Sequence, residues 1–399
     1  MRAPAPCASG RSGRRAPRRL ILAAAFAAAL LAGTAPRAHD QSASIALSRQ
    51  AELAPGIGYY TFDDAGHLGP DAPISARAVE IRPDGTRLDL ELGKDGTQGR
   101  DSVLSMARRR GAVAAINAGF FGTAGDPSGI LKIDGVLISD YDTPRGAVAF
   151  SRAEGPPLLF DRVTARARAR VGRTDVAIGG IDTRRGGRDI VLYTPRYGAA
   201  TRTEGQGTEW TLEGKPLRVT RIAKATASAP SPSAIPRAGY VLSVSGAIPP
   251  ALSRLTRGAG VSLSFTYAPA LGTTPASWRD ADDIVGGAGL LLWRGKAIDD
   301  WTPERLQSSF VTSRHPRTII GRDREGDTWL VVIDGRQPGH SVGMTLPELT
   351  AFARRLGFVD ALNLDGGGST TMVVNGDVVN RPSDPFMRPV SDAIVVLRR

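Results

Sequence analysis

Two short apolar segments flank one helical segment near the C-terminal end of the chain, and this order limits the fold more than any other sequence feature. Residues 329–333 are apolar and precede Asp334, and residues 361–364 are apolar and precede Asp365. Between them, residues 346–356 carry apolar side chains at helical spacing. A strand, a helix and a strand joined by a single crossover predict two strands that run parallel. We therefore expect both aspartates at one edge of a sheet, where open α/β sheets place their ligands.

Both ends of this helical segment carry capping signals. The Thr345 hydroxyl can accept a hydrogen bond from the first-turn amides, and Glu348 can reach back to the Thr345 amide, which together form a capping box. Gly357 is typical of a helix end. The sequence therefore predicts a helix over residues 346–356.

The rest of the chain predicts many strands and few helices. Its 47 glycines and 28 prolines favour a turn-rich protein over a helical bundle. Further expected elements are a hairpin of residues 77–82 and 87–92, a helix from the cap Asp101 to Arg110, a buried strand at 112–116, a loop or internal boundary at 225–234, and a hairpin of residues 371–374 and 378–379 around Asn375 and Gly376. We expect an α/β protein of the mixed α+β kind, with a strand-rich mixed sheet and few helices in a single domain.

The first 38 residues predict an export signal. Five arginines precede an apolar run at 20–32, and a short stretch of small and polar residues follows. Cleavage is expected after Ala35 or Ala38, by either the general or the twin-arginine route, and a retained membrane anchor is the alternative. Residues 39–75 are expected to be a lead-in, loose up to residue 56, and residues 76–399 the domain itself. No later apolar run reaches the roughly 18 residues that a membrane span needs.

Charge and cysteine content argue against several classes of protein. The formal charge is +12, but residues 1–38 hold seven arginines and no acid, so their removal leaves +5. No basic block with interleaved aromatics is present, which argues against a nucleic-acid partner. The one cysteine, Cys7, lies in the predicted signal, so we expect no disulfide and no thiolate metal site. The oligomeric state leaves no mark in the sequence.

Asp334 and Asp365 are the first candidate catalytic residues. Cleavage of a glycosidic bond commonly uses two carboxylates, one to protonate the leaving oxygen and one as nucleophile or water base. An Asp-Gly pair after a strand is also a common turn, so a structural role is the alternative. Ends of neighbouring strands lie about 5 Å apart, or about twice that with a strand between. The sequence therefore leaves retention and inversion open.

The residues after Asp365 form a candidate phosphate site. Backbone amides can approach a ligand closely in the glycine run, and two hydroxyl residues follow it. The members are Gly366, Gly367, Gly368, Ser369 and Thr370. No Lys-Ser or Lys-Thr pair follows, so the run is not a Walker loop. A tight bend into the following hairpin is the alternative.

Three further polar residues are candidate ligands. Arg314 can bind phosphate bidentately, and His315 titrates near neutral pH. A surface turn with scattered arginines is the alternative for this pair. Asn117 ends a predicted strand and can hydrogen-bond a substrate hydroxyl, although such a residue is often part of a turn.

Six short motifs occur in order along the chain, and the ordered set is more specific than any member. They lie at residues 116–121, 314–318, 334–337, 341–349, 363–370 and 380–384. Over residues 76–397 the chain resembles the phosphodiester glycosidase family, whose best-known member removes N-acetylglucosamine to uncover mannose 6-phosphate. Ser369 and Thr370 stand where two serines are expected, which keeps a hydroxyl at the second position.

The resemblance implies an exported hydrolase that cleaves a glycosyl phosphodiester in an envelope or extracellular glycan. The implied catalytic residues are Asp334, Asp365 and His315. The implied ligands of the phosphodiester are Arg314, His315, Arg336 and the amides around Gly367. A divalent cation, Ca²⁺ or Mg²⁺, held by aspartate oxygens stays open.

Two other functions stay open at this point. The first is a non-catalytic glycan-binding or exopolysaccharide-assembly protein on the same scaffold, because a fold does not secure an activity. It predicts binding without turnover. The second is a metal-dependent phosphodiesterase that cuts the phosphorus–oxygen bond, and it predicts that oxygen from water enters the phosphate.

Overall fold

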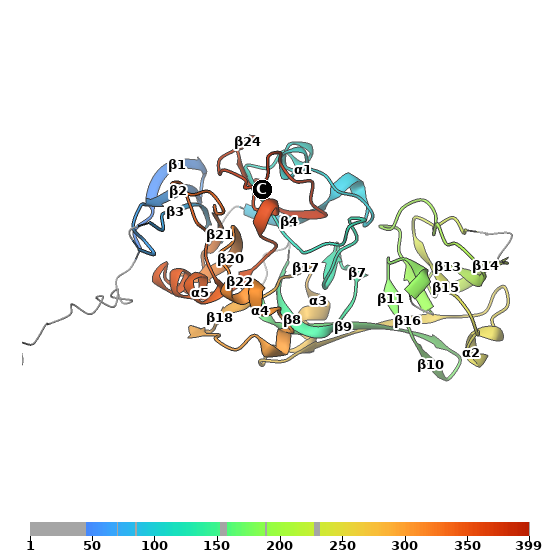
Figure 1. The fold of residues 1–399 in the computed structure, drawn as a ribbon. Helices are drawn as coiled ribbons and strands as arrows, with labels where there is room; N and C mark the ends of the chain where they lie inside the picture. Colours follow the sequence, from blue (N-terminus) through green and yellow to red (C-terminus); the bar gives the residue numbers. More distant parts are fainter. Residues whose placement is uncertain are drawn as a thin grey trace, which may run out of the picture. The chain divides into compact units, whose positions relative to one another are not determined.

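The computed structural model describes residues 45–398, except for residues 70, 84–85, 152–157, 188–189 and 227–231. Over these residues the chain forms four sheets and a few short helices (Figure 1). This arrangement confirms the strand-rich, mixed α/β class. The predicted export signal and the centre of the loop predicted at 225–234 lie outside the described residues.

The first sheet has eight strands, and every neighbouring pair in it is antiparallel. In spatial order they are β1 (Ser48–Ala54), β2 (Ile57–Asp64), β3 (Ile74–Ile81), β21 (Thr328–Ile333), β20 (Arg317–Asp323), β22 (Phe358–Asn363), β18 (Leu290–Trp293) and β19 (Lys296–Ala297). Because β20 is antiparallel to both β21 and β22, the latter two run parallel to each other.

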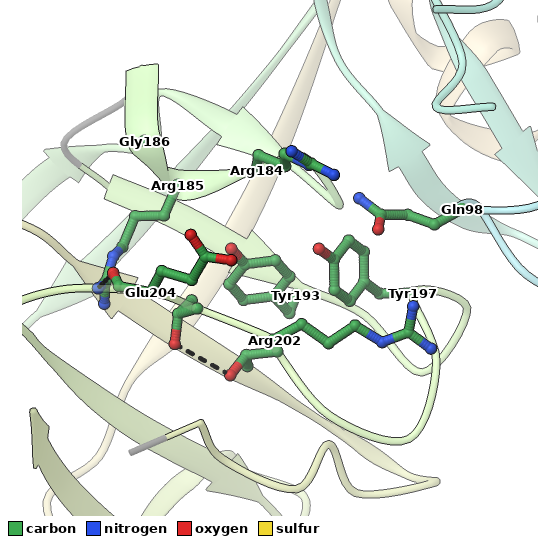
Figure 2. A pocket seen from close by; sticks show the side chains of 10 residues that line it. Gln98, Arg184, Arg185, Gly186, Tyr193, Tyr197, Arg202 and Glu204 are labelled. Carbon is green, nitrogen blue, oxygen red and sulfur yellow. Dashed lines mark hydrogen bonds between the residues drawn. The ribbon is translucent and has the colours of Figure 1, made fainter. Parts of the chain in front are cut away.

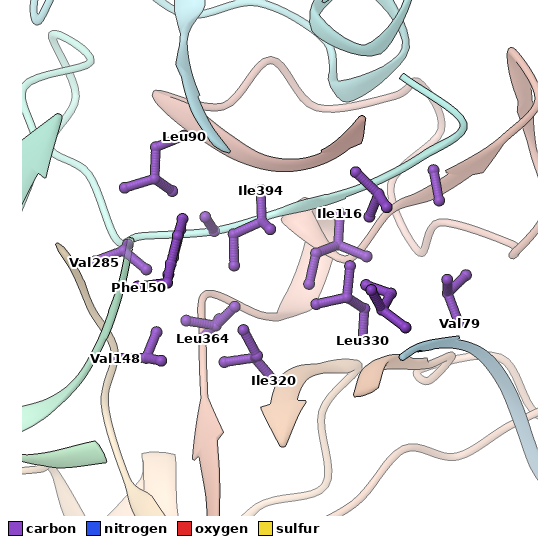
Figure 3. Packing of buried hydrophobic residues seen from close by; sticks show 14 of the residues in the cluster. Val79, Leu90, Ile116, Val148, Phe150, Val285, Ile320, Leu330, Leu364 and Ile394 are labelled. Carbon is purple, nitrogen blue, oxygen red and sulfur yellow. The ribbon is translucent and has the colours of Figure 1, made fainter. Parts of the chain in front are cut away.

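The fourth sheet has five antiparallel strands and packs against the first. In spatial order they are β24 (Asp377–Val378), β23 (Met372–Val374), β5 (Ala114–Asn117), β25 (Asp392–Arg398) and β4 (Thr86–Leu92). Ile320 and Leu330 of the first sheet share one core with Leu90, Ile116 and Ile394 of the fourth (Figure 3).

The second and third sheets share a further core, to which Ala147, Trp210 and Leu242 belong. The second sheet also contributes Val148, Phe150 and Val285 to the core of the first and fourth sheets (Figure 3). The second contains β10 (Thr174–Ala177), β9 (Leu159–Val171), β8 (Tyr141–Phe150), β17 (Asp283–Gly286), β6 (Leu131–Ile133) and β7 (Val136–Ser139), with β16 (Ser262–Pro269) beside β9. The third contains β11 (Gly180–Ile181), β12 (Ile190–Tyr193), β15 (Gly239–Val244), β13 (Gly207–Glu213) and β14 (Arg218–Ala225). Only β11 and β12 pair in parallel among the described strands.

Two helices cover the outer faces of the first and fourth sheets. The α-helices are α1 (Val103–Arg110), α2 (Pro250–Ser253), α3 (Pro275–Asp280), α4 (Ser308–Thr312) and α5 (Leu346–Arg355). Leu349 and Phe352 of α5 pack on the first sheet, and Met106 of α1 packs on the fourth. The order α5, first sheet, fourth sheet, α1 therefore makes a four-layered arrangement around the core of Figure 3.

The C-terminal predictions are confirmed. Helix α5 begins with the predicted capping box between Thr345 and Glu348, and Gly357 follows its end with φ +89°. Asn375 and Gly376 both have positive φ in the turn between β23 and β24, as the hairpin prediction requires.

The hairpin predicted between residues 77–82 and 87–92 is wrong in its pairing, although both strands exist. Strand β3 has β2 and β21 on its two edges, and β4 pairs with β25 in the other sheet. A turn signal shows that the chain changes direction, but it does not show which edge each strand will use.

Two other predictions need correction. The cap of α1 is Ser102, whose hydroxyl accepts from the Ser105 amide, while Asp101 accepts from the Ser102 amide and the Ser105 hydroxyl. The loose lead-in is wrong for Ser48–Ala54, which is edge strand β1. Five of its seven residues are exposed, so no alternation of apolar and polar residues marks it.

Candidate active site

The candidate site lies where β20, β21 and β22 meet at one edge of the first sheet. Register pairs Arg317 with Ile333 and Ile319 with Asn363, so the start of β20 lies beside the ends of β21 and β22. Asp334 therefore lies on one side of β20 and the Asp365 loop on the other. The edge predicted from the sequence is confirmed, with one strand between the two aspartates.

Asn117, at the end of β5, ties this edge to the fourth sheet. Its amide nitrogen donates to the Asp365 carbonyl at 2.7 Å, and its amide oxygen accepts from the Thr318 hydroxyl at 2.9 Å and the Thr371 amide at 3.1 Å. The side chain is fully buried. These contacts favour a positioning role for Asn117 over the predicted contact with substrate.

The glycine run is enclosed by its neighbours, which explains its composition. A Cβ on Gly366 would lie 2.6 Å from the Pro316 carbonyl oxygen, and one on Gly368 would collide with the Asp384 carboxylate. Gly367 has φ +63°, and a Cβ there would lie 3.2 Å from the Arg336 guanidinium. Glycine is therefore required at Gly367 by its positive φ and at Gly366 and Gly368 by the close approach of neighbouring atoms.

The two hydroxyl residues after the run are buried. The Thr370 hydroxyl lies 3.4 Å from the Thr318 hydroxyl, and the Thr370 carbonyl accepts from the Asn380 amide group. The Ser369 hydroxyl lies beside the Asp365 carboxyl and lowers its pKa. Of the pair, Ser369 is thus the one coupled to the candidate catalytic group.

Asp365 carries the most informative carboxyl of the site. Burial raises its pKa from 3.8 to about 6, although the Ser369 hydroxyl, the Gly366 amide and the Arg388 charge oppose the change. The Gly366 amide donates to Oδ1 at 2.9 Å. A carboxyl that titrates near neutral pH can serve as an acid or as a base in catalysis.

A second buried carboxyl, Asp392, was not predicted from the sequence. Its charge raises the pKa of Asp365, which shows that the two groups interact. Burial raises the pKa of Asp392 as well, against hydrogen bonds from the Ser391 hydroxyl and from the Gly119 amide at 2.6 Å. Asp392 begins β25, and only its position before an apolar strand could have indicated it.

Asp384 and Arg388 complete this side of the site and were also missed as functional residues. The Arg388 Nε donates to Asp384 Oδ2 at 2.9 Å, and the Arg388 charge lowers the pKa of Asp365. Asp384 ends the last of the six sequence motifs, which was the available signal. The Asp365 carboxyl is thus bordered by one carboxyl, Asp392, and one guanidinium, Arg388.

Arg336 and His315 lie on the other side of Gly367. Arg336 is exposed, has φ +59°, and has no carboxylate partner among the residues that the structure describes. Its Nη2 lies 3.0 Å from His315 Nδ1. A guanidinium only donates, so Nδ1 accepts and Nε2 carries the ring proton. Burial, with the charges of Arg317 and Arg336, lowers the pKa of His315 and so favours the neutral ring.

Asp334 is buried and its carboxylate is fully occupied. Oδ1 accepts from the Asn380 amide group at 2.9 Å and the Arg381 amide at 3.1 Å, and Oδ2 accepts from the Arg381 amide at 3.0 Å and His340 Nε2 at 2.9 Å. These contacts fasten the 380–384 segment to the end of β21. They favour a structural role for Asp334, the alternative raised by its sequence, over a catalytic one.

Arg314 is held by helix α5 rather than by the site. It makes a bidentate ion pair with Glu348, at 2.7 Å for the closest contact, and this partner raises the Arg314 pKa. Arg317 is buried, donates to the carbonyls of Met344, Phe310 and Ser313, and has its pKa lowered to about 10 by burial. Among the predicted arginine ligands, Arg336 is therefore the one positioned to meet an anion.

No cluster of three or more potential metal-ligating His, Cys, Asp or Glu side chains occurs in the described part of the chain. Within the same residues, no helix is both long and apolar enough to cross a membrane.

Comparison with known proteins agrees with the motif set. Residues 218–397 match the model of the phosphodiester glycosidase family. A mouse N-acetylglucosamine-1-phosphodiester alpha-N-acetylglucosaminidase is 44% identical over 103 residues, which is 25% of this chain and 20% of that protein. The chain thus aligns with about a fifth of the length of this curated relative.

Two solved structures share the fold. A hypothetical protein of Synechocystis has a TM-score of 0.74 and 24% identity over 89% of this chain and 64% of its own. A candidate exported protein of Burkholderia pseudomallei has a TM-score of 0.67 and 23% identity over 83% of this chain and 75% of its own. The matched fold therefore extends well beyond residues 218–397.

Proposed function

We propose that this protein is an exported hydrolase that cleaves a glycosyl phosphodiester in an envelope or extracellular glycan. The match of residues 218–397 to the model of the phosphodiester glycosidase family supports this proposal. The observation that carries the proposal is the Asp365 loop. The loop carries a partly buried carboxyl whose pKa is about 6, and its Gly367 lies beside the exposed guanidinium of Arg336. A glycosyl phosphodiester requires this combination of an acid or base with an anion-binding group.

The anion-binding part consists of Arg336 and His315. The Arg336 guanidinium lies beside Gly367. It forms no ion pair with a carboxylate of the described residues, so it can bind a phosphodiester oxygen. Neutral His315 orients Arg336 by accepting from it, and its Nε2–H supplies a further donor. Arg388 places a further positive charge near Asp365.

The partly buried carboxyl of Asp365 and the buried carboxyl of Asp392 act on the anomeric carbon. In the reaction, an oxygen nucleophile bonds to the anomeric carbon, the bond from that carbon to the phosphate oxygen breaks, and a phosphomonoester leaves. A phosphomonoester is already a good leaving group, so the step at the carbon needs a nucleophile or a base more than an acid. The charge of Asp392 contributes to the raised pKa of Asp365, and neighbouring carboxyls whose pKa values differ can divide the roles of acid, base and nucleophile.

A divalent cation remains part of the proposal as an option. Both oxygens of Asp334 and both oxygens of Asp392 already accept from protein donors. The remaining candidate ligands near the site are therefore Oδ2 of Asp365 and Oδ1 of Asp384. Oxygen ligands of this kind suit Ca²⁺ or Mg²⁺. Assays with and without chelator decide whether turnover needs it.

Turnover of a defined panel tests the proposal. Purified protein is incubated with UDP-N-acetylglucosamine and a set of glycosyl-1-phosphodiesters, and free sugar and phosphomonoester are both measured. We expect release by the unchanged protein and none by Asp365→Asn. Asp377→Asn, the same change at an exposed hairpin residue, is the matched control and should retain full turnover.

Isotope labelling separates hydrolysis of the two bonds. In ¹⁸O water, cleavage at the anomeric carbon places the label in the sugar, whereas cleavage at phosphorus places it in the phosphate. Label in the phosphate would replace the glycosidase with the phosphodiesterase. Tight binding of a panel member without turnover would replace it with the glycan-binding protein.

A further inference from the structure

A second polar cavity, of about 370 Å³, lies between the third sheet and the loop before α1, and none of the candidate active-site residues lines it. Its lining includes Gln98, Arg184, Tyr193, Tyr197, Arg202 and Glu204 (Figure 2). We call it the Tyr193 pocket. Its volume lies in the range of small-molecule sites, which begins near 300 Å³.

Two buried polar atoms of the pocket have no hydrogen-bond partner among the described residues. They are the Tyr193 hydroxyl, on a fully buried residue that ends β12, and the Gln98 amide nitrogen. Buried polar groups are almost always paired, and an unpaired one destabilises the folded protein. The pocket thus presents a hydroxyl and an amide donor to whatever enters it.

Two guanidiniums flank the tyrosine rings. Figure 2 shows Arg184 and Arg202 on either side of Tyr193 and Tyr197, whose ring centroids are 4.6 Å apart. Both arginines are exposed and form no ion pair within the described residues, and both charges act on the Tyr197 hydroxyl. Arg202 also has φ +49°, a conformation that non-glycine residues seldom adopt.

The wall behind these groups is held in place by a buried carboxylate. Glu209 accepts from the hydroxyls of Thr201, Thr203 and Ser243 and from the Ser233 amide. On the opposite side, the Thr97 amide donates to the Arg196 carbonyl at 2.9 Å, which fixes the loop that carries Gln98. The pocket is therefore preorganised on both sides, which lowers the entropic cost of binding.

We propose that the Tyr193 pocket binds an anionic monosaccharide unit of a glycan, with the negative charge between Arg184 and Arg202. The sugar hydroxyls pair with the Tyr193 hydroxyl, the Gln98 amide and the Glu204 carboxylate, which supply both donors and acceptors. Arginine beside tyrosine and a neutral amide suits a compact ligand that combines a charge with several hydroxyls. The proposal is independent of the reaction at Asp365.

Calorimetric titration tests this binding on the full chain. The probes are α-D-glucose 1-phosphate and D-glucuronate, which place the charge on a phosphate or on a carboxylate, with D-glucose and inorganic phosphate as controls. We expect at least one charged sugar to bind with a Kd at or below about 1 mM. Neutral glucose and inorganic phosphate should each bind at least about tenfold more weakly. Glucose lacks the negative charge for the two arginines, and inorganic phosphate lacks the sugar hydroxyls.

Three variants assign the binding to the pocket. Arg184→Gln with Arg202→Gln should weaken it at least about tenfold. The matched control, Arg166→Gln with Arg168→Gln, changes the same charge at exposed positions of β9 and should have no effect. Tyr193→Phe keeps the buried ring and should weaken binding about tenfold without lowering the melting temperature, because it removes an unpaired hydroxyl.

The same titration contains the results that would overturn the proposal. These are no binding of either charged sugar, unchanged affinity in the Arg184 and Arg202 variant, equal loss in the β9 control, or inorganic phosphate binding as tightly as the sugar phosphate. Repeating the titration with Arg336→Gln separates the two sites, because binding in the Tyr193 pocket should survive that change. Binding in the Tyr193 pocket without any turnover by the unchanged protein would refute only the hydrolase proposal.

Discussion

Replacing Asp365 with asparagine is predicted to stabilise the folded protein above pH 6 while abolishing turnover. Burial raises the pKa of Asp365 from 3.8 to about 6. A difference of one pKa unit corresponds to 1.36 kcal/mol, so the buried carboxylate costs the folded state about 3 kcal/mol when it is ionised. Asparagine keeps an oxygen that can accept from the Gly366 amide and carries no charge to desolvate.

The predicted gain depends on pH in one direction. Because the folded pKa lies above the unfolded value, the folded state binds more protons between about pH 4 and pH 6. The contribution of Asp365 to stability is therefore complete below about pH 4 and is lost as the pH rises through 6. Asp365→Asn should match the unchanged protein near pH 4 and exceed it by about 3 kcal/mol at pH 8.

Thermal unfolding at the two pH values measures the effect. One kcal/mol shifts the melting temperature by about 2–4 °C in domains of 150–250 residues and by less in a longer one, so we expect a rise of a few degrees at pH 8. The control Asp377→Asn should melt with the unchanged protein at both pH values. A lower melting temperature for Asp365→Asn at pH 8, or an equal shift at both pH values, would refute the reasoning.

Further predictions concern groups around the site. Arg336→Gln should lower kcat/KM about 100-fold in steady-state assays, because it removes the exposed anion ligand, whereas Arg314→Gln should change it little because Glu348 holds Arg314; equal losses would contradict this assignment. Phe386→Ala should raise KM without lowering kcat, because this 86% exposed ring lies on the loop that carries the site's ion pair; a fall in kcat at constant KM would contradict it. Asp334→Asn should lower the free energy of unfolding in urea by about 2 kcal/mol, since the amide group cannot accept from all three donors of Asp334; an unchanged value would exclude a structural role.

The parts of the fold that depend on local signals could be predicted from the sequence. The helix at 346–356 was predictable because its cap, its apolar face and its terminal glycine all lie within a dozen residues. The pairing of β3 and β4 was not, because each strand found its partners far along the chain. Strand β1 escaped prediction since most of its side chains face solvent, which removes the periodic signal.

The candidate site shows the same division. The sequence indicated the Asp365 loop, because a glycine run after a strand is a local pattern with a physical meaning. It did not indicate Asp392, which reaches the site only because β25 pairs with β5. It also did not show that the Asp334 carboxylate accepts hydrogen bonds from Asn380 and Arg381, because these donors lie in a segment more than forty residues later.

Strand β25 lies between β4 and β5 in the fourth sheet. The candidate active site can therefore be completed only when this sheet is completed. In the sequence, β4 ends 300 residues (392 − 92) and β5 ends 275 residues (392 − 117) before β25 begins. During synthesis both strands therefore carry an unpaired edge until β25 arrives. Because Asp392 enters with that strand, a nascent chain can hold the Asp365 loop but not its second carboxyl. Turnover should therefore begin only after β25 has been inserted between β4 and β5. The time at which activity appears would then measure when the fold is completed.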